Sequence, residues 1–160
     1  MSRPLRVALI GAYSSRNLGD VAIEKALIEN LRALEPDVAI SGLSYDPADT
    51  TACFGIPAHP LMPTEPAATA DGSTPASFPR RVVRALTTRL GRLARELRFT
   101  FDAYRVVREV DLLIAAGGGQ LDEYWGGAWG HPFALLSWSR LCRFAGRRFC
   151  GFTRDFSFSD

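Results

Sequence analysis

The segment from Arg6 to Leu34 constrains the fold of this chain more than any other part of its sequence. It begins with an apolar run, Val7 to Ile10, which has the length of a buried strand, and continues through a polar loop that contains glycine. Apolar residues then recur three and four positions apart, the spacing of one helix face, at Ile23, Leu27, Leu31 and Leu34. A strand, a polar loop and a helix open an α/β domain, so we expect a parallel sheet flanked by helices.

The loop between this strand and helix has the features of a ligand site. Asn17 is suited to cap the helix, and Asp20 then lies in the first turn, where the helix dipole favours a carboxylate. Gly11 and Gly19 permit backbone angles that side chains forbid. A helix N-terminus at the carboxyl end of a strand is also where phosphates and carboxylates bind. Neither a G-x-G-x-x-G pattern nor a P-loop is present, and a plain capped helix is the alternative interpretation.

Composition narrows the class of protein. The 160 residues suffice for one domain, and 47% hydrophobic with 22% charged residues is typical of a globular chain. A net charge of +2 gives no reason to expect nucleic acid as a partner. Three cysteines, Cys53, Cys142 and Cys150, form no disulfide framework and no metal-ligand spacing. With no apolar run of about 20 residues and no signal peptide, we expect a cytoplasmic protein without a metal site.

The region after the first helix predicts a second strand and a turn. Pro36 should end the helix near Glu35, and Val38 to Leu43 has the composition of a strand. Asp46 follows it, at the place where many nucleotide-binding α/β folds hold a ribose with an acidic side chain. Asp46-Pro47 is also an ordinary turn signal, and we favour the turn.

The segment from Pro57 to Pro79 has a different composition from its surroundings. It holds six of the ten prolines, so we expect residues 57–79 to form a mobile loop, with His59 on the surface. The preceding residues, Cys53 to Ile56, are interpreted as a short third strand.

The stretch from Arg80 to Val110 predicts a long amphipathic helix. Its apolar residues step by three and four, at Leu86, Leu90, Leu93, Leu97, Phe101 and Tyr104. The stretch contains nine arginines, from Arg80 to Arg108, and only three acidic residues. The favoured interpretation is a helix whose leucine stripe packs in the core and whose basic face meets water. The alternative is a peripheral membrane contact through Arg80 to Arg108, with anionic lipid or a lipid-linked substrate.

The run from Asp111 to Ala116 is the clearest strand, and Gly117-Gly118-Gly119-Gln120 follows it directly. Three successive glycines add chain entropy that folding must remove, which suits a backbone that approaches a ligand or binds an anion. A tight turn is the alternative. If the sheet is parallel, Gly11 and Gly118 lie at the same edge of it.

A loop rich in tryptophan and glycine comes next. Asp122, Trp125, Trp129 and His131 bring carboxylate, indole and imidazole groups together, a chemistry suited to sugars. The alternatives are that the indoles form a local core and that His131 is a cap. Pro132 then suits the first turn of a helix over Phe133 to Ala145, which Gly146 ends. Phe149 to Phe152 is expected to begin another strand.

Two motifs taken together, GAYSSRNLGDVAI and DLLIAAGGGQLDEYWGGAWGHP, resemble the polysaccharide pyruvyl transferase family. The resemblance covers Arg6 to Gly55 and Asp111 to Phe149. It implies a Rossmann-like half of a glycosyltransferase-B-like fold, and transfer of a pyruvyl group from phosphoenolpyruvate to a sugar of a cell-surface polysaccharide or a lipid-linked precursor. No cofactor is expected besides this donor substrate. The substrate-binding residues expected from the motifs are Gly11, Asn17, Gly19, Asp20, Gly117, Gly118, Gly119, Gln120, Asp122, Trp125, Trp129 and His131.

The resemblance stops near residue 152. Residues 153–160 depart from the family's continuation, so we expect residues 1–152 to correspond to the N-terminal domain and residues 153–160 to be a diverged or truncated tail. In the family, basic residues of the second half hold most of the donor's anionic groups. Two other interpretations therefore stay open: a glycosyltransferase with a nucleotide-sugar donor, and a non-catalytic remnant.

Overall fold

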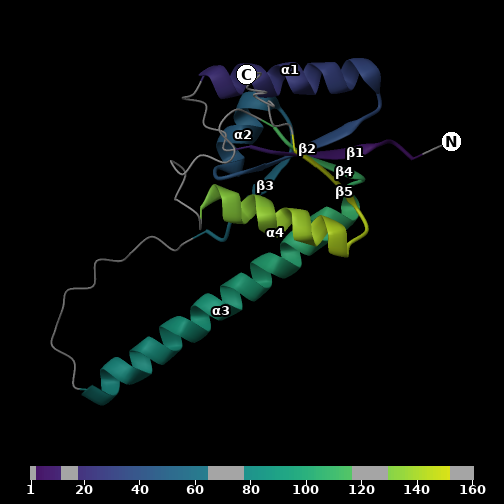
Figure 1. The fold of residues 1–160 in the computed structure, drawn as a ribbon. Helices are drawn as coiled ribbons and strands as arrows, with labels where there is room; N and C mark the ends of the chain where they lie inside the picture. The colour runs from purple at the N-terminus through teal and green to yellow at the C-terminus, as the bar shows by residue number, and fades with distance from the viewer. Residues whose placement is uncertain (1–2, 12–17, 65–77, 117–129, 152–160) are drawn as a thin grey trace, which may run out of the picture.

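The computed structural model describes residues 3–11, 18–64, 78–116 and 130–151, with the backbone alone described in residues 78–87. Strands and helices alternate along these segments (Figure 1). In chain order the elements are β1 (Arg6–Ile10), α1 (Leu18–Leu34), β2 (Ala39–Ser44), α2 (Pro47–Phe54), β3 (Ala58–Pro60), α3 (Phe78–Glu109), β4 (Leu112–Ala115), α4 (His131–Phe144) and β5 (Arg148–Gly151).

The strands form one five-stranded parallel sheet with the order β3-β2-β1-β4-β5. In register, Ile10 of β1 lies beside Leu43 of β2 on one side and Ala115 of β4 on the other. The chain therefore adds β2 and β3 on one side of β1, and then crosses back to add β4 and β5 on the other side. This reversal makes the β1–β4 boundary the topological switch point of the sheet.

Helices cover both faces of the sheet, with α1 and α2 on one side and α3 and α4 on the other (Figure 1). Alternate residues of β1 point into the two cores, as the pleat of a strand requires. Val7 and Leu9 pack with Ile28 of α1, whereas Ala8 and Ile10 pack with Val107 of α3 and Trp138 of α4. The fold is thus the expected α/β architecture, a Rossmann-like parallel sheet flanked by helices.

Most predicted elements lie where the periodicity placed them. The first helix ends at Leu34, the second strand ends at Ser44, and the strand before the glycine run spans Leu112–Ala115. The helix that contains Pro132 begins at His131, and the final strand begins at Arg148. These boundaries differ from the predicted ones by only a few residues, since Pro36, Pro132 and Gly146 mark the helix ends in the sequence.

The prediction of a strand over Cys53 to Ile56 is wrong, because this region belongs mostly to α2. Asp46 is the N-cap of that helix and Pro47 occupies its first turn, while Gly55 ends it with a left-handed φ of 65°. The third strand comes later, at Ala58–Pro60, and contains His59, which is half-buried.

The prediction of a mobile loop over residues 57–79 is also wrong at its start. Ala58–Pro60 pairs with β2, and the amide of Leu61 donates a hydrogen bond to the carbonyl of Ser44 at 2.8 Å. The Leu61 side chain is 1% exposed. The extended backbone that proline favours is compatible with an edge strand, so a proline-rich composition did not prevent pairing here. Residues 65–77 lie outside the described segments.

The interpretation of the α3 leucine stripe as core is wrong for its described part. Leu90, Leu93, Leu97 and Phe101 are 56–63% exposed. The residues of α3 that enter the core are instead Ala103 and Val107, with Phe99 packed against them. These three residues step by four along another side of the helix, so the core uses a second, shorter apolar stripe near the C-terminal end of α3.

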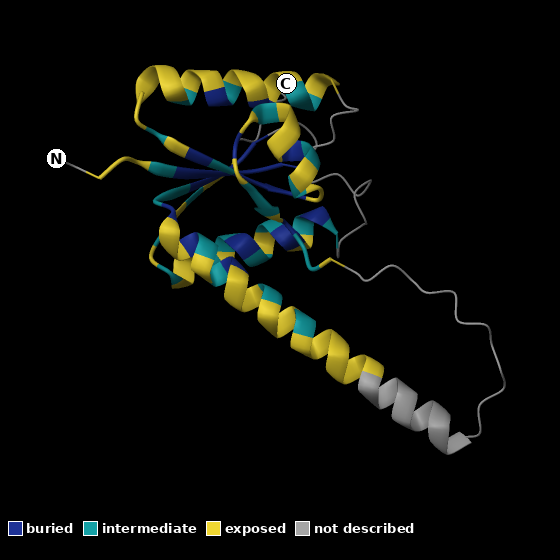
Figure 2. Cartoon of the chain, turned by 180° about the vertical axis from the view of Figure 1, so that it is seen from behind, coloured by how far each residue is buried: buried dark blue, intermediate teal, exposed yellow. Residues whose placement is uncertain are grey.

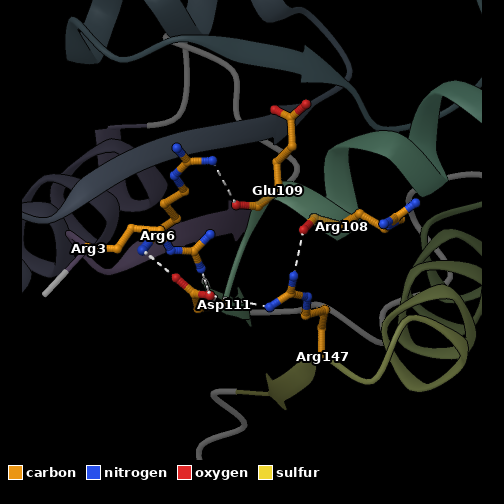
Figure 3. Close-up of polar contacts among 6 residues, drawn as sticks. All are labelled: Arg3, Arg6, Arg108, Glu109, Asp111 and Arg147. Carbon is orange, nitrogen blue, oxygen red and sulfur yellow. Dashed lines mark hydrogen bonds and ion pairs between the residues drawn. The ribbon is translucent and has the colours of Figure 1, made fainter.

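A polar cluster fixes the amino edge of the sheet around Asp111, which immediately precedes β4 (Figure 3). Its carboxylate accepts a hydrogen bond from the Arg6 amide at 3.1 Å and pairs with the guanidinium groups of Arg3 and Arg147. Arg147 also donates to the carbonyl of Arg108 at 2.7 Å. Asp111 therefore ties the start of β1 to the end of α3 and to the turn before β5.

Candidate functional site

The candidate site lies at the carboxyl edge of the sheet, where β1 and β4 end side by side. The amide of Gly11 donates to the carbonyl of Leu43 at 3.3 Å, and the amide of Ala116 donates to the carbonyl of Ile10 at 2.9 Å. Gly11 and Ala116 therefore leave neighbouring strands at one edge. The chain continues from Ala116 directly into the glycine run. Ligands of open parallel sheets bind outside the carboxyl ends at such a switch point.

Polar burial in the described segments is concentrated near this same edge. Four polar or charged residues are buried there, each at most 1% exposed: Glu24, Ser44, Thr50 and His131. Ser44 is the last residue of β2, and His131 is the first residue of α4. Glu24 and Thr50 lie within the first two turns of α1 and α2. Burying polar groups is costly unless they are hydrogen-bonded, so their gathering at one edge points to a built polar site.

His131 is the expected site residue that the structure describes best. Its Nδ1 lies 3.4 Å from the Tyr45 hydroxyl oxygen, and the two rings are tilted by 47° with centroids 6.0 Å apart. Burial lowers the pKa of His131 below its ordinary value of 6.5 and raises the pKa of Tyr45 above 10.0. At neutral pH the pair is therefore an uncharged imidazole beside an uncharged phenol, which can exchange hydrogen bonds but adds no positive charge.

The N-terminus of α4 brings a positive partial charge to the site. Its N-cap is Gly130, and no side chain makes a cap hydrogen bond there. The first turn of α4 contains no acidic residue, and the positive end of its dipole lies at the carboxyl edge.

The N-terminus of α2 has a different environment. The Asp46 carboxylate accepts the amide of Asp49 at 3.1 Å, and the Thr50 hydroxyl lies 2.7 Å from that of Ser44. Asp46 is therefore a helix cap at the start of α2, a role that agrees with a local turn signal better than with ribose binding.

The first two turns of α1 contain a buried acidic residue, Glu24, that was not predicted from the sequence. Asp20 lies in the first turn, as predicted, and Glu24 follows it by one turn. Gly19 is helical, and neither Gly19 nor Gly11 has a positive φ, so the expectation that these two glycines adopt backbone angles forbidden to side chains is wrong. Glu24 is 0% exposed, whereas Ile23 is 47% and Leu34 is 77% exposed. Of the predicted stripe, Leu27 and Leu31 pack against the core, whereas the fully buried residues of α1 are Glu24 and Ile28. The four-residue spacing of Asp20, Glu24 and Ile28 was the available signal.

Eight of the expected site residues lie outside the described segments. They are Asn17, Gly117, Gly118, Gly119, Gln120, Asp122, Trp125 and Trp129. Their assigned roles stay predictions. Of the other four, Gly11, Gly19, Asp20 and His131, each lies at the carboxyl edge or in the first turn of a helix that begins there.

Two further findings on the described residues concern a metal site and a membrane-spanning helix. They contain no group of three or more His, Cys, Asp or Glu side chains that could hold a metal ion. Within the same segments, no helix combines the length and the apolar composition needed to cross a membrane.

The burial of His131 predicts a pH dependence of stability. Because the folded pKa lies below the unfolded value of about 6.5, the unfolded chain takes up the proton first. The stabilising contribution is complete above pH 6.5 and is lost as the pH falls below it. Urea denaturation between pH 7.5 and 5.5 should show the free energy of unfolding decreasing more steeply for the wild type than for His131→Gln. Equal slopes for the two proteins would contradict the burial of this imidazole.

Comparison with known proteins adds no relative. The chain matches no family model, no curated protein and no solved structure.

Proposed function

We propose that the carboxyl edge of this domain binds the phosphate-bearing donor of a pyruvyl transfer reaction, phosphoenolpyruvate. In this reaction two hydroxyl oxygens of one sugar bond to the enol carbon of the donor, and phosphate departs with its bridging oxygen. One hydroxyl proton goes to the methylene carbon, which becomes a methyl group, and the other leaves with phosphate. The product is a cyclic ketal on a cell-surface polysaccharide or its lipid-linked precursor.

The observation that carries the proposal is the pairing of β1 with β4. The two motifs that resemble pyruvyl transferases begin about one hundred residues apart; the first follows β1 directly, and the second contains β4 and the glycine run after it. Their strands are neighbours, with Ile10 beside Ala115. Both loops therefore start at the switch point, where one ligand can meet both. Such convergence is what a shared binding site requires and is not needed by two independent turns.

The chemistry at this edge suits an anionic ligand with adjacent hydroxyl groups. The first turn of α4 carries no acidic residue, so the positive end of its dipole favours a phosphate or carboxylate, whereas Asp20 already occupies the first turn of α1. Neutral His131 and Tyr45 can orient hydroxyl groups without attracting a competing anion. In the family that the motifs resemble, a second Rossmann-like half supplies basic donor-binding residues, so turnover requires both halves of the cleft.

A nucleotide-sugar glycosyltransferase is less well supported. In doubly wound nucleotide-binding folds an acidic side chain after the second strand holds the ribose. Here the corresponding residue, Asp46, is the N-cap of α2, and its carboxylate already accepts a hydrogen bond from the Asp49 amide.

Titration of the isotopically labelled chain with phosphoenolpyruvate, followed by amide NMR shifts, tests the proposal. We expect shifts at Gly11, Gly19 and His131, with none at Gly146, a control glycine in the turn between α4 and β5. A nucleotide sugar should leave the first three unchanged. Phosphate release measured by phosphorus NMR should be absent from this chain alone. Shifts at the carboxyl edge with the nucleotide sugar and none with phosphoenolpyruvate would overturn the proposal, as would an absence of shifts with either ligand.

A further inference from the structure

The described part of α3 carries a row of large apolar side chains that the domain does not cover. Leu90, Leu93, Leu97 and Phe101 are each more than half exposed and recur three and four positions apart. The side of α3 that packs on the sheet is another one, which contains Ala103 and Val107. Figure 2 shows the described part of α3 away from the sheet as mostly exposed. A contiguous exposed apolar surface of this kind marks an interaction site.

The shape of the helix makes this surface accessible. α3 has 32 residues, which corresponds to about 48 Å at 1.5 Å per residue. Its C-terminal part lies against the sheet and α4, and its N-terminal part extends away from the body of the domain (Figure 1). The exposed row therefore lies along an arm that a flat partner can approach over several turns.

The exposed row continues onto α4. The rings of Tyr104 and Phe144 meet edge to face with centroids 6.1 Å apart, and Phe144 is 83% exposed. Between the two helices lies an apolar groove of about 590 Å³, to which Phe99, Phe133 and Phe144 contribute. The apolar surface is therefore wider than a single helix stripe where α3 meets α4.

The charge of α3 indicates what kind of partner this surface fits. Nine arginines lie between Arg80 and Arg108, against Glu96, Asp102 and Glu109. At about 100° per residue, Arg95 and Arg98 project from sides of the helix away from Leu97, and both lie in the exposed arm. A helix with arginines on one face and leucine and phenylalanine on the other is typical of helices that lie in a membrane interface.

We propose that α3 docks along the surface of an anionic membrane, with the Leu90–Phe101 row entering the acyl boundary and the arginines contacting lipid phosphates. Charge selects this occupant over a second copy of the chain. Two α3 helices that pair through their leucine rows would bring two strongly basic segments together, whereas anionic lipid neutralises them. The inference stands on α3 and is independent of the chemistry proposed at the carboxyl edge.

Sedimentation of the full chain with lipid vesicles tests the docking surface. We expect binding to vesicles of phosphatidylcholine and phosphatidylglycerol at a ratio of about 3:1, much weaker binding to pure phosphatidylcholine, and weakening with added salt. The double variant Leu93→Gln/Leu97→Gln should bind at least tenfold more weakly. Its control is Leu34→Gln, which removes a leucine that is 77% exposed at the end of α1, against 56% and 63% for Leu93 and Leu97, and should bind like the wild type.

A second variant pair tests the charge. Arg92→Gln/Arg95→Gln should weaken binding by about thirtyfold at low salt, because each arginine near an anionic surface contributes about 1 kcal/mol. Arg32→Gln, on the last turn of α1, is the matched control and should have no effect. Equal binding to neutral and anionic vesicles, or equal binding by the α3 variants and their controls, would overturn the proposal. So would an absence of vesicle binding together with a dimer that Leu93→Gln/Leu97→Gln dissociates, a result that would assign the surface to a second copy.

Discussion

Replacement of Trp138 by alanine is expected to lower the free energy of unfolding by about 4–5 kcal/mol, the upper range for truncation of a large aromatic side chain. The indole is 1% exposed and meets Phe99 of α3 edge to face, with ring centroids 6.3 Å apart. Its Nε1 donates to the carbonyl of Leu61 at 2.9 Å. The substitution leaves a cavity between α4, α3 and the sheet. It also removes the indole N–H that donates to the buried Leu61 carbonyl, which is then left without this hydrogen bond.

Urea denaturation followed by circular dichroism measures this effect. Trp138→Phe keeps most of the ring and loses the hydrogen bond, so it should cost about 1–3 kcal/mol. Phe144→Ala is the control for an aromatic residue on the same helix; its side chain is 83% exposed, and the change should stay near 0.5 kcal/mol. If Trp138→Ala does not fold, the Phe variant still reports the buried hydrogen bond. A cost below about 1 kcal/mol for Trp138→Ala would contradict the packing of α4 on the sheet.

The Trp138 contacts also bear on the candidate site. His131 lies two turns before Trp138 on α4, and Tyr45 follows β2, whose last residue, Ser44, accepts the amide of Leu61. The indole hydrogen bond to Leu61 therefore links the helix that carries His131 to the strand end that carries Tyr45. Trp138 lies seven residues after His131 on the same face of α4, so the indole hydrogen bond and the His131–Tyr45 contact join the same helix to the same end of β2.

Local patterns were sufficient to predict the alternation of strands and helices. β1 and β4 are short apolar runs, Pro36 follows the end of α1, and α4 has Pro132 in its first turn and Gly146 after its last residues, so these elements can be predicted from neighbouring residues. The region of α2 and β3 was misassigned because its strand has only three residues and contains a proline. At that length, pairing with β2 decides the conformation, and no pattern within the segment can show it.

The side of a helix that is buried was harder to predict than the helix itself. In α3 the longer leucine row suggested the core, yet a shorter row through Ala103 and Val107 meets the sheet. In α1 the buried face includes Glu24 in place of Ile23. Periodicity reports that a helix has an apolar side, whereas burial depends on how the helix is docked, which is a property of the tertiary fold.

The candidate site was predicted in outline because parallel strands bring their carboxyl ends to one edge. That rule predicts that Gly11 and the glycine run lie at the same edge, and the structure places Gly11 and Ala116, the residue before the run, at the ends of neighbouring strands. The contact between His131 and Tyr45 was not predictable, since the two residues are 86 positions apart and belong to different supersecondary units. Only the order of the strands and the docking of α4 bring them together.

Substitution of Asp111 by alanine is expected to lower the free energy of unfolding by about 2 kcal/mol, from the loss of charge-assisted hydrogen bonds. The Asp111 carboxylate accepts the Arg6 amide at 3.1 Å and pairs with Arg3 and Arg147, whose side chains are 51% and 30% exposed. Exposed ion pairs contribute little, so most of the effect should come from the bond to the Arg6 backbone and from the less exposed Arg147.

Two further variants separate these contributions. Asp111→Asn keeps an oxygen that can accept the Arg6 amide but removes the charge, so it should recover at least half of the loss. Asp37→Ala, an exposed aspartate in the turn before β2, should change the stability by less than about 0.5 kcal/mol. Because salt screens the arginine pairs and leaves the backbone bond intact, about 1 M sodium chloride should reduce the difference between wild type and Asp111→Asn more than that between Asp111→Asn and Asp111→Ala. Equal stabilities of Asp111→Ala and Asp37→Ala would show that the cluster does not hold β1 to the amino end of β4.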